Sequence, residues 1–136
     1  MKIHLRRPPM PDPQAQALQI AAGRLIAASV IIAAPVFSAR LLGADTATAQ
    51  RVTWLTRMMA IRDGALGAGG IAATRRGDSV ATWVLGGAVS DAVDAAVLAA
   101  ALKRGRARGI VPAGIAVGAA GAAVLGVVTA VRVRRS

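Results

Sequence analysis

Residues 110–131 carry no charge, and this apolar run is long enough to constrain the fold of the whole chain. A helix rises 1.5 Å per residue, so about 20 apolar residues are needed to cross a hydrocarbon core about 30 Å thick. The run has that length, and basic segments border it at residues 103–108 and 132–135. We therefore expect a membrane-spanning helix here.

The composition of the chain points to the same class of protein. Of 136 residues, 55% are hydrophobic and only 2% are aromatic, and the mean hydropathy is +0.55. Soluble cores of this size usually rely on aromatic side chains, whereas membrane helices pack closely through small residues. The chain has no cysteine, which excludes disulfides and thiolate metal sites.

Three further apolar segments predict an all-α protein, a bundle of four transmembrane helices within a single membrane domain at residues 18–136. The predicted helices cover residues 18–42, 54–74, 80–102 and 110–131. Trp54 and Trp83, each near the start of a helix, suit the membrane interface. The second helix is the weakest, because its uninterrupted part is short and contains Arg62 and Asp63.

The segments outside these helices are expected to be irregular. Residues 1–17 contain four prolines and several basic residues, which predicts a flexible, disordered tail. Pro35 is expected to kink the first helix, and Arg24 and Arg40, near its two ends, are expected to extend toward lipid headgroups. Residues 43–51 are small and polar, which favours a loop.

A cleaved signal peptide is an alternative for the N-terminal region. Residues 25–37 have the length of its apolar core, and residues 47–49 have the small-x-small form of a cleavage site. The distance between them, which includes Arg40, is longer than the usual cleavage region. We therefore favour an uncleaved membrane span.

The formal net charge is +11, from 17 Lys and Arg against 6 acidic residues. Such a balance can indicate nucleic-acid binding, but the basic residues flank apolar runs, and no aromatic platform for bases accompanies them. We expect anionic lipid as the partner and no nucleic acid.

Four spans place both termini on one side of the membrane. Eight basic residues lie on that side and six on the opposite side, which favours the cytoplasmic side of the plasma (inner) membrane for the termini. The basic loop at residues 103–108 opposes this orientation.

Charged side chains inside the predicted second and third helices need partners or a function, because a charge at the bilayer centre costs roughly 2.5 to 3.5 kcal/mol. These residues are Arg57, Arg62, Asp63, Asp91 and Asp94. Counting from the turn near Gly77, Arg62 and Asp91 lie at the same depth in an antiparallel hairpin. Asp94 shares a face with Asp91, and Arg57 is expected to reach Asp94.

Two interpretations of this polar centre stay open. In the first, the charges neutralise one another in a buried ion-pair network that fixes which helices touch. In the second, an excess aspartate carries protons or cations across the membrane.

Small residues recur every four positions in the last predicted helix, at Gly114, Gly118, Ala122 and Gly126. A stripe of this kind allows close approach of another helix, within the chain or in a homodimer. The glycines at residues 64–70 lack the Gly-Lys-Ser/Thr ending of a phosphate-binding loop, and helix packing explains them better.

The chain offers little for catalysis. His4 is the single histidine and lies in the predicted tail, glutamate is absent, and no serine has a nearby base. We expect no enzymatic activity, no cofactor and no metal site.

Three segments carry a resemblance to a known family: RMMAIRDGALG at residues 57–67, RRGD at 75–78 and GAVSDAVDA at 87–95. The chain resembles small four-helix integral membrane proteins of unknown function that are common in actinobacteria. The resemblance implies a four-helix bundle in the plasma membrane and no assigned activity. Small multidrug transporters are similar in size but carry an acidic residue in the first helix and several aromatics, which this chain lacks.

These observations favour a non-enzymatic structural or accessory subunit of a membrane assembly, with other membrane proteins or a second copy as partners. The alternative is a small proton-coupled transporter or channel that acts as a homodimer.

Overall fold

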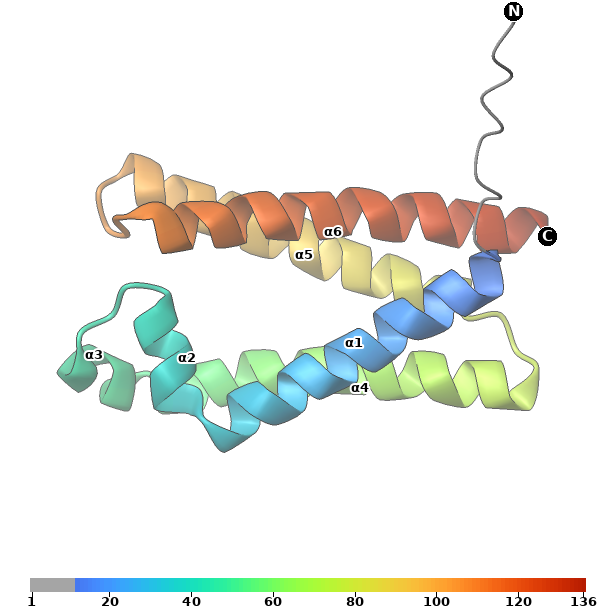
Figure 1. The fold of residues 1–136 in the computed structure, drawn as a ribbon, viewed down its shortest axis with the longest axis horizontal. Helices are drawn as coiled ribbons and strands as arrows, with labels where there is room; N and C mark the ends of the chain where they lie inside the picture. Colours follow the sequence, from blue (N-terminus) through green and yellow to red (C-terminus); the bar gives the residue numbers. More distant parts are fainter. Residues whose placement is uncertain (1–11) are drawn as a thin grey trace, which may run out of the picture.

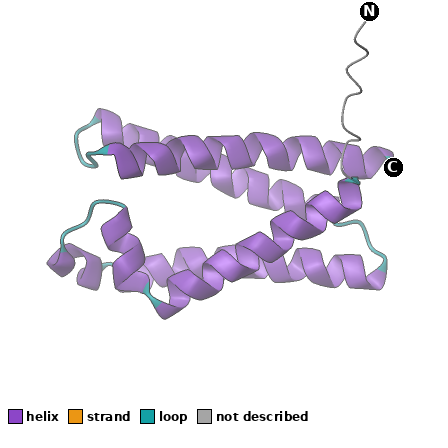
Figure 2. Ribbon diagram, viewed as in Figure 1, coloured by secondary structure: helices purple, strands orange, loops and turns teal. Residues whose placement is uncertain are grey.

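The computed structural model describes residues 12–136, and the regular structure in this range is entirely helical (Figures 1 and 2). The helices are α1 (Pro13–Ala33), α2 (Pro35–Leu41), α3 (Thr46–Arg51), α4 (Thr53–Arg76), α5 (Ala81–Lys103) and α6 (Ile110–Arg135). The all-α class is thus confirmed. The predicted tail over residues 1–11, with His4, lies outside the described residues.

The first helix starts earlier than the sequence pattern predicted. The Asp12 side chain accepts hydrogen bonds from the backbone N–H groups of Gln14 and Ala15, at 3.4 and 3.1 Å, and so caps the N-terminus of α1. Pro13 occupies the first helical position, where a missing N–H costs nothing. Residues 13–17, which we assigned to the tail, are therefore helical.

Pro35 divides the predicted helix 18–42 into two. Proline has no N–H to donate to the carbonyl of Ile31, so the regular hydrogen-bonding pattern stops there. α1 ends at Ala33, and α2 leaves in a different direction (Figure 1). The predicted kink is a complete break.

The segment predicted as a loop, residues 43–51, contains the short helix α3. The Asp45 carboxylate accepts hydrogen bonds from the N–H and the hydroxyl group of Thr48, at 2.9 and 2.8 Å, and caps this helix. Gly43 precedes it with a φ of 91°, a conformation that favours glycine. The prediction was wrong here because the aspartate was counted only as a polar loop residue.

The long helices associate in two pairs that do not follow chain order. α1 packs along α4, and α5 packs along α6, with much less contact between these two pairs (Figure 1). Glycines allow both close approaches: a Cβ at Gly67 would lie 2.6 Å from the Ala21 carbonyl oxygen, and one at Gly126 would lie 2.9 Å from the Ala88 Cβ. Small residues thus hold each pair together, as in membrane helices.

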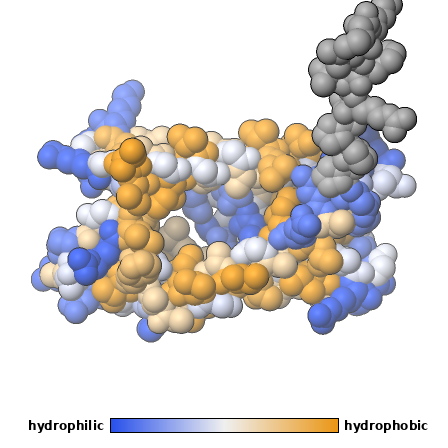
Figure 3. Space-filling model, in the orientation of Figure 1, coloured by the Kyte–Doolittle hydropathy of each residue, from blue (hydrophilic) through white to orange (hydrophobic). Residues whose placement is uncertain are grey.

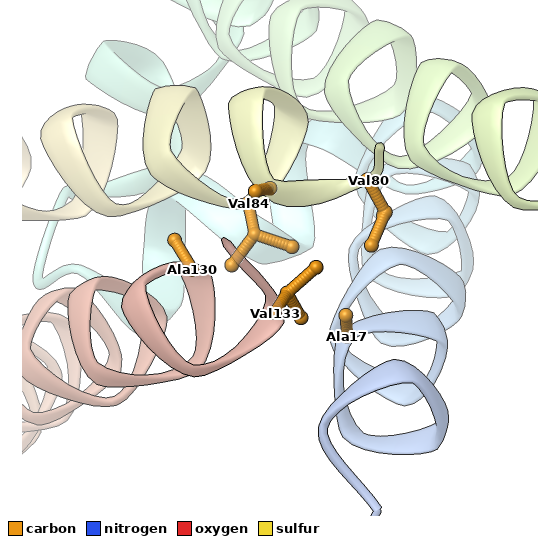
Figure 4. Packing of buried hydrophobic residues seen from close by; sticks show 6 residues of the cluster. Ala17, Val80, Val84, Ala130 and Val133 are labelled. Atoms are coloured by element: carbon orange, nitrogen blue, oxygen red, sulfur yellow. The ribbon is translucent and has the colours of Figure 1, made fainter. Parts of the chain in front are cut away.

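The two pairs meet at the end of the bundle where α1 begins and α6 ends. Figure 4 shows Ala17, Val80, Val84, Ala130 and Val133 packed there, and all five are buried. Next to this cluster α4 turns into α5 through Gly77, whose φ is 73°. At the other end of the bundle, the loop between α2 and α3 lies close to the loop between α5 and α6. A Cβ added at Gly43 would lie 3.6 Å from the Arg108 carbonyl oxygen.

Three helices, α1, α5 and α6, are long and apolar enough to cross a membrane. Their buried residues are mostly alanine, while larger side chains such as Ile26, Val97 and Val117 are exposed on the outside. Figure 3 shows broad hydrophobic surfaces along the helices, with hydrophilic surface at both ends. This distribution suits a bundle surrounded by lipid and makes a multi-pass membrane protein plausible.

Candidate functional site: a charged cluster between the helix pairs

Five charged side chains gather near the middle of α1, α4 and α5. This charged cluster consists of Arg24, Arg62, Asp63, Asp91 and Asp94. Since α1 and α4 belong to one helix pair and α5 to the other, the cluster lies at the boundary between the pairs.

Arg24 is the most buried member, with 13% of its side chain exposed. Its guanidinium forms ion pairs with Asp91 of α5 and, at 3.4 Å, with Asp63 of α4. It also donates a hydrogen bond of 2.9 Å to the Gly87 carbonyl oxygen. A Cβ on Gly87 would lie 2.6 Å from Arg24 Nε, so the absence of a side chain at this position leaves room for the guanidinium.

Arg62 forms the second half of the cluster. Its Nη2 lies 2.7 Å from Asp94 Oδ2, and its Nε lies 3.2 Å from Asp63 Oδ1. Asp63 therefore forms ion pairs with both arginines and connects the two halves. Arg62 and Asp94 are 39% and 30% exposed, so this half is the more open one.

The structure brings together four of the five residues that we expected in the polar centre. The cluster contains Arg62, Asp63, Asp91 and Asp94. We predicted that Arg62 and Asp91 lie at the same depth, but Arg62 contacts Asp94 instead. Arg57 is exposed and forms no ion pair among the described residues. The expectation that it reaches Asp94 is thus not met.

Sequence reasoning missed Arg24, which takes the place that we gave to Arg57. We placed Arg24 at the membrane edge because we expected the first helix to begin at residue 18. The helix begins at Pro13, which moves Arg24 close to the middle of α1. The pair Asp12 and Pro13, an N-cap residue followed by proline, was the signal that could have found this start.

The cluster holds two guanidinium groups and three carboxylates, so one formal negative charge is in excess when all are ionised. The described residues contain no group of three His, Cys, Asp or Glu arranged to hold a metal ion. Figure 3 shows a hollow between the two helix pairs with hydrophilic surface inside it. Buried charge and a polar hollow thus occur together at the centre of an apolar bundle.

The predicted stripe on the last helix divides into two parts. Gly126 packs against Ala88 of α5, whereas Gly114, Gly118 and Ala122 are exposed. A Cβ added at Gly114 or Gly118 would meet nothing within 4 Å. Only the last position of the stripe serves packing within the described part of the chain.

Comparison of the chain with family models, with curated proteins and with solved structures finds no match.

Proposed function

We propose that the chain is a non-enzymatic membrane protein with four spans, in which the charged cluster has an architectural role. The supporting observation is that Arg24 joins α1 to α4 within one helix pair and to α5 of the other. The apolar contact between the pairs is concentrated at one end of the bundle. The cluster supplies specific contacts farther along the boundary, where it fixes how the pairs meet.

In this proposal α4 is the fourth span. It has 24 residues, about 36 Å at 1.5 Å per residue, and it runs beside α1 along the bundle (Figure 1). Its central charges, Arg62 and Asp63, have partners, which lowers the cost of placing them in lipid. Its large apolar residues Trp54, Met58 and Ile61 are exposed.

The setting that we propose is a plasma membrane rich in anionic lipid, with both termini on the cytoplasmic side. The start of α1 and the end of α6 lie at the same end of the bundle, which supports a common side (Figure 1). The resemblance to four-helix actinobacterial membrane proteins agrees with this arrangement. In this proposal the bundle acts as a structural or accessory subunit of a larger assembly, or as a homodimer.

One observation favours a second candidate, a proton-coupled carrier or channel. The excess carboxylate and the hydrophilic hollow are features that a proton path needs. A carrier of this kind would bind a proton at the cluster and release it on the other side.

Asparagine variants separate the two functions. Asp91→Asn and Asp94→Asn are reconstituted in liposomes, with Asp78→Asn in the exposed α4–α5 turn as the matched control. An architectural cluster predicts a lower melting temperature for the first two variants and no proton flux in any protein. Flux in the wild type that disappears in Asp91→Asn, without loss of stability, would establish the carrier instead.

A further inference from the structure

The break between α1 and α2 forms an open groove on the outside of the bundle. Residues 33–37 of the break line it, together with Arg40 and Leu41, and its volume is about 720 Å³. The charged cluster contributes no residue to it.

The length of α1 places this groove at the membrane interface. α1 has 21 residues, so at 1.5 Å per residue it extends about 31 Å, close to the thickness of a hydrocarbon core. If α1 begins at one interface, Pro35 lies at the other. The groove therefore lies where acyl chains meet headgroups.

The groove has apolar walls and one charged residue. Phe37 and Leu41 are 61% and 47% exposed, and both contribute to the lining. Arg40 is exposed and forms no ion pair among the described residues. A ligand that fits must offer a long apolar part and an anionic group next to it.

The surrounding end of the bundle is strongly basic. Its other basic residues are Arg51, Lys103, Arg104, Arg106 and Arg108. Asp45 is the acid of the α2–α3 connection, and its carboxylate is occupied by Thr48. This positive field raises the local concentration of anionic lipid and disfavours a cationic ligand.

We propose that this groove is a binding site for one anionic phospholipid. The acyl chain lies along Phe37 and Leu41, and the phosphate accepts hydrogen bonds from the Arg40 guanidinium. The proposal rests on the membrane placement argued above, and it adds a defined lipid position where Pro35 interrupts the first span. A bound lipid would also cover the apolar surface that this interruption leaves open.

Two variants at the same end of the bundle test the site. The purified protein in dodecyl maltoside is titrated with dioleoyl phosphatidylglycerol, and bound lipid is counted by native mass spectrometry. Arg40→Gln should bind at least about tenfold more weakly, because the charge-assisted hydrogen bond to the phosphate is lost. Arg51→Gln, which removes a charge from α3 outside the groove, should weaken binding only slightly, through the loss of one charge from the surrounding positive field.

Three further ligands identify what the groove recognises. Dioleoyl phosphatidylcholine should bind several-fold more weakly than the phosphatidylglycerol. Inorganic phosphate at the same concentration should show no binding, because it has no apolar part to contact the walls of the groove. A phosphatidylglycerol with a photoactivatable acyl chain should cross-link the unmodified protein within residues 33–41.

Equal weakening in Arg40→Gln and Arg51→Gln, equal binding of the two lipids, or cross-links spread evenly over the helices would overturn the proposal. The cross-linking needs no variant, so it decides the matter even if Arg40→Gln does not fold. Cysteine labelling of the protein in sealed vesicles tests the membrane placement separately. A loss of lipid preference is therefore distinguishable from a failure of the four-span arrangement.

Discussion

The Arg24 guanidinium of α1 binds the Asp91 carboxylate of α5, across the boundary between the two helix pairs. The two side chains are 13% and 15% exposed, so both charged groups are largely buried between the helices. Removing one partner of such a pair leaves the other charge buried alone, which is costly.

Arg24→Gln should therefore destabilise the protein by about 3 to 5 kcal/mol, the usual cost of breaking a buried ion pair. The measurement is the melting temperature in detergent, followed by tryptophan fluorescence. Arg57→Gln is the matched control, because Arg57 is exposed and forms no ion pair among the described residues. Equal losses in the two variants would contradict the architectural role of Arg24.

Asp94→Asn should have a smaller effect than Arg24→Gln, because the amide keeps an oxygen that can accept from Arg62, and Asp63 remains as a second ion-pair partner of Arg62. Combining it with Arg62→Gln should cost less than the sum of the single changes, because the two residues share one interaction. A double-mutant cycle on melting data measures this coupling. If the stability losses of the two single variants simply add in the double variant, the Arg62–Asp94 contact does not contribute to stability.

Gly67→Ala should separate α1 from α4. The added Cβ would lie 2.6 Å from the Ala21 carbonyl oxygen and 2.9 Å from the Leu25 nitrogen, both backbone atoms. Overpacking of this kind typically costs about 1 to 3 kcal/mol, against a helix-propensity gain of roughly 0.5 to 1 kcal/mol. Gly118→Ala is the control and should be neutral or slightly stabilising, because its Cβ meets nothing within 4 Å. Thermal unfolding of the two variants gives the comparison.

The cap of α3 should weaken in acid. Hydrogen bonds from Thr48, first the backbone N–H and then the hydroxyl, lower the pKa of Asp45 below its usual 3.8. A lowered folded-state pKa means that the stabilisation is present above pH 3.8 and is lost as the pH falls through the lower folded value. NMR titration of the Asp45 carboxyl carbon measures the pKa directly. Thr48→Ala removes the hydroxyl bond and keeps the backbone N–H bond, so it should move the pKa part of the way back toward 3.8. An unchanged value would mean that the hydroxyl does not contribute to the lowered pKa.

Single cysteines can test whether α4 crosses the membrane, because the chain has none of its own. Ala47→Cys in α3 precedes α4, and Ser79→Cys in the turn follows it. Four spans predict that an impermeant maleimide labels these two positions from opposite sides of sealed vesicles. If α4 does not cross, both cysteines will be labelled from the same side. Ser136→Cys at the C-terminus should label from the side of Ser79→Cys in either case and checks vesicle integrity.

The positions of α4, α5 and α6 were predictable because each is a long apolar or small-residue run ended by basic residues and a turn. The start of α6 was predicted at the observed residue, and the other predicted and observed ends differ by one to four residues, as fraying and capping allow. The first helix was predicted less well, since its start depends on the Asp12 cap and its end on Pro35. Hydropathy reports neither of these local hydrogen-bonding effects.

Most members of the charged cluster could be named from the sequence, because a charge in an apolar run is conspicuous. Their pairing could not be predicted. We considered α4 and α5 as neighbours because they are consecutive, and so did not consider α1 as a source of the cation. The pairing of α1 with α4 depends on glycine contacts such as Gly67 with Ala21, which become visible only when the helices are placed together.

The order of helix pairing has a consequence for biosynthesis. Arg24 precedes its partner Asp91 by 67 residues, so α1 leaves the ribosome long before the acid that neutralises it. In the proposed membrane arrangement, this cation must stay near the headgroups or within the insertion machinery until α4 and α5 have supplied Asp63 and Asp91. The first hydrophobic segment can therefore take its final depth only after most of the polypeptide has been translated.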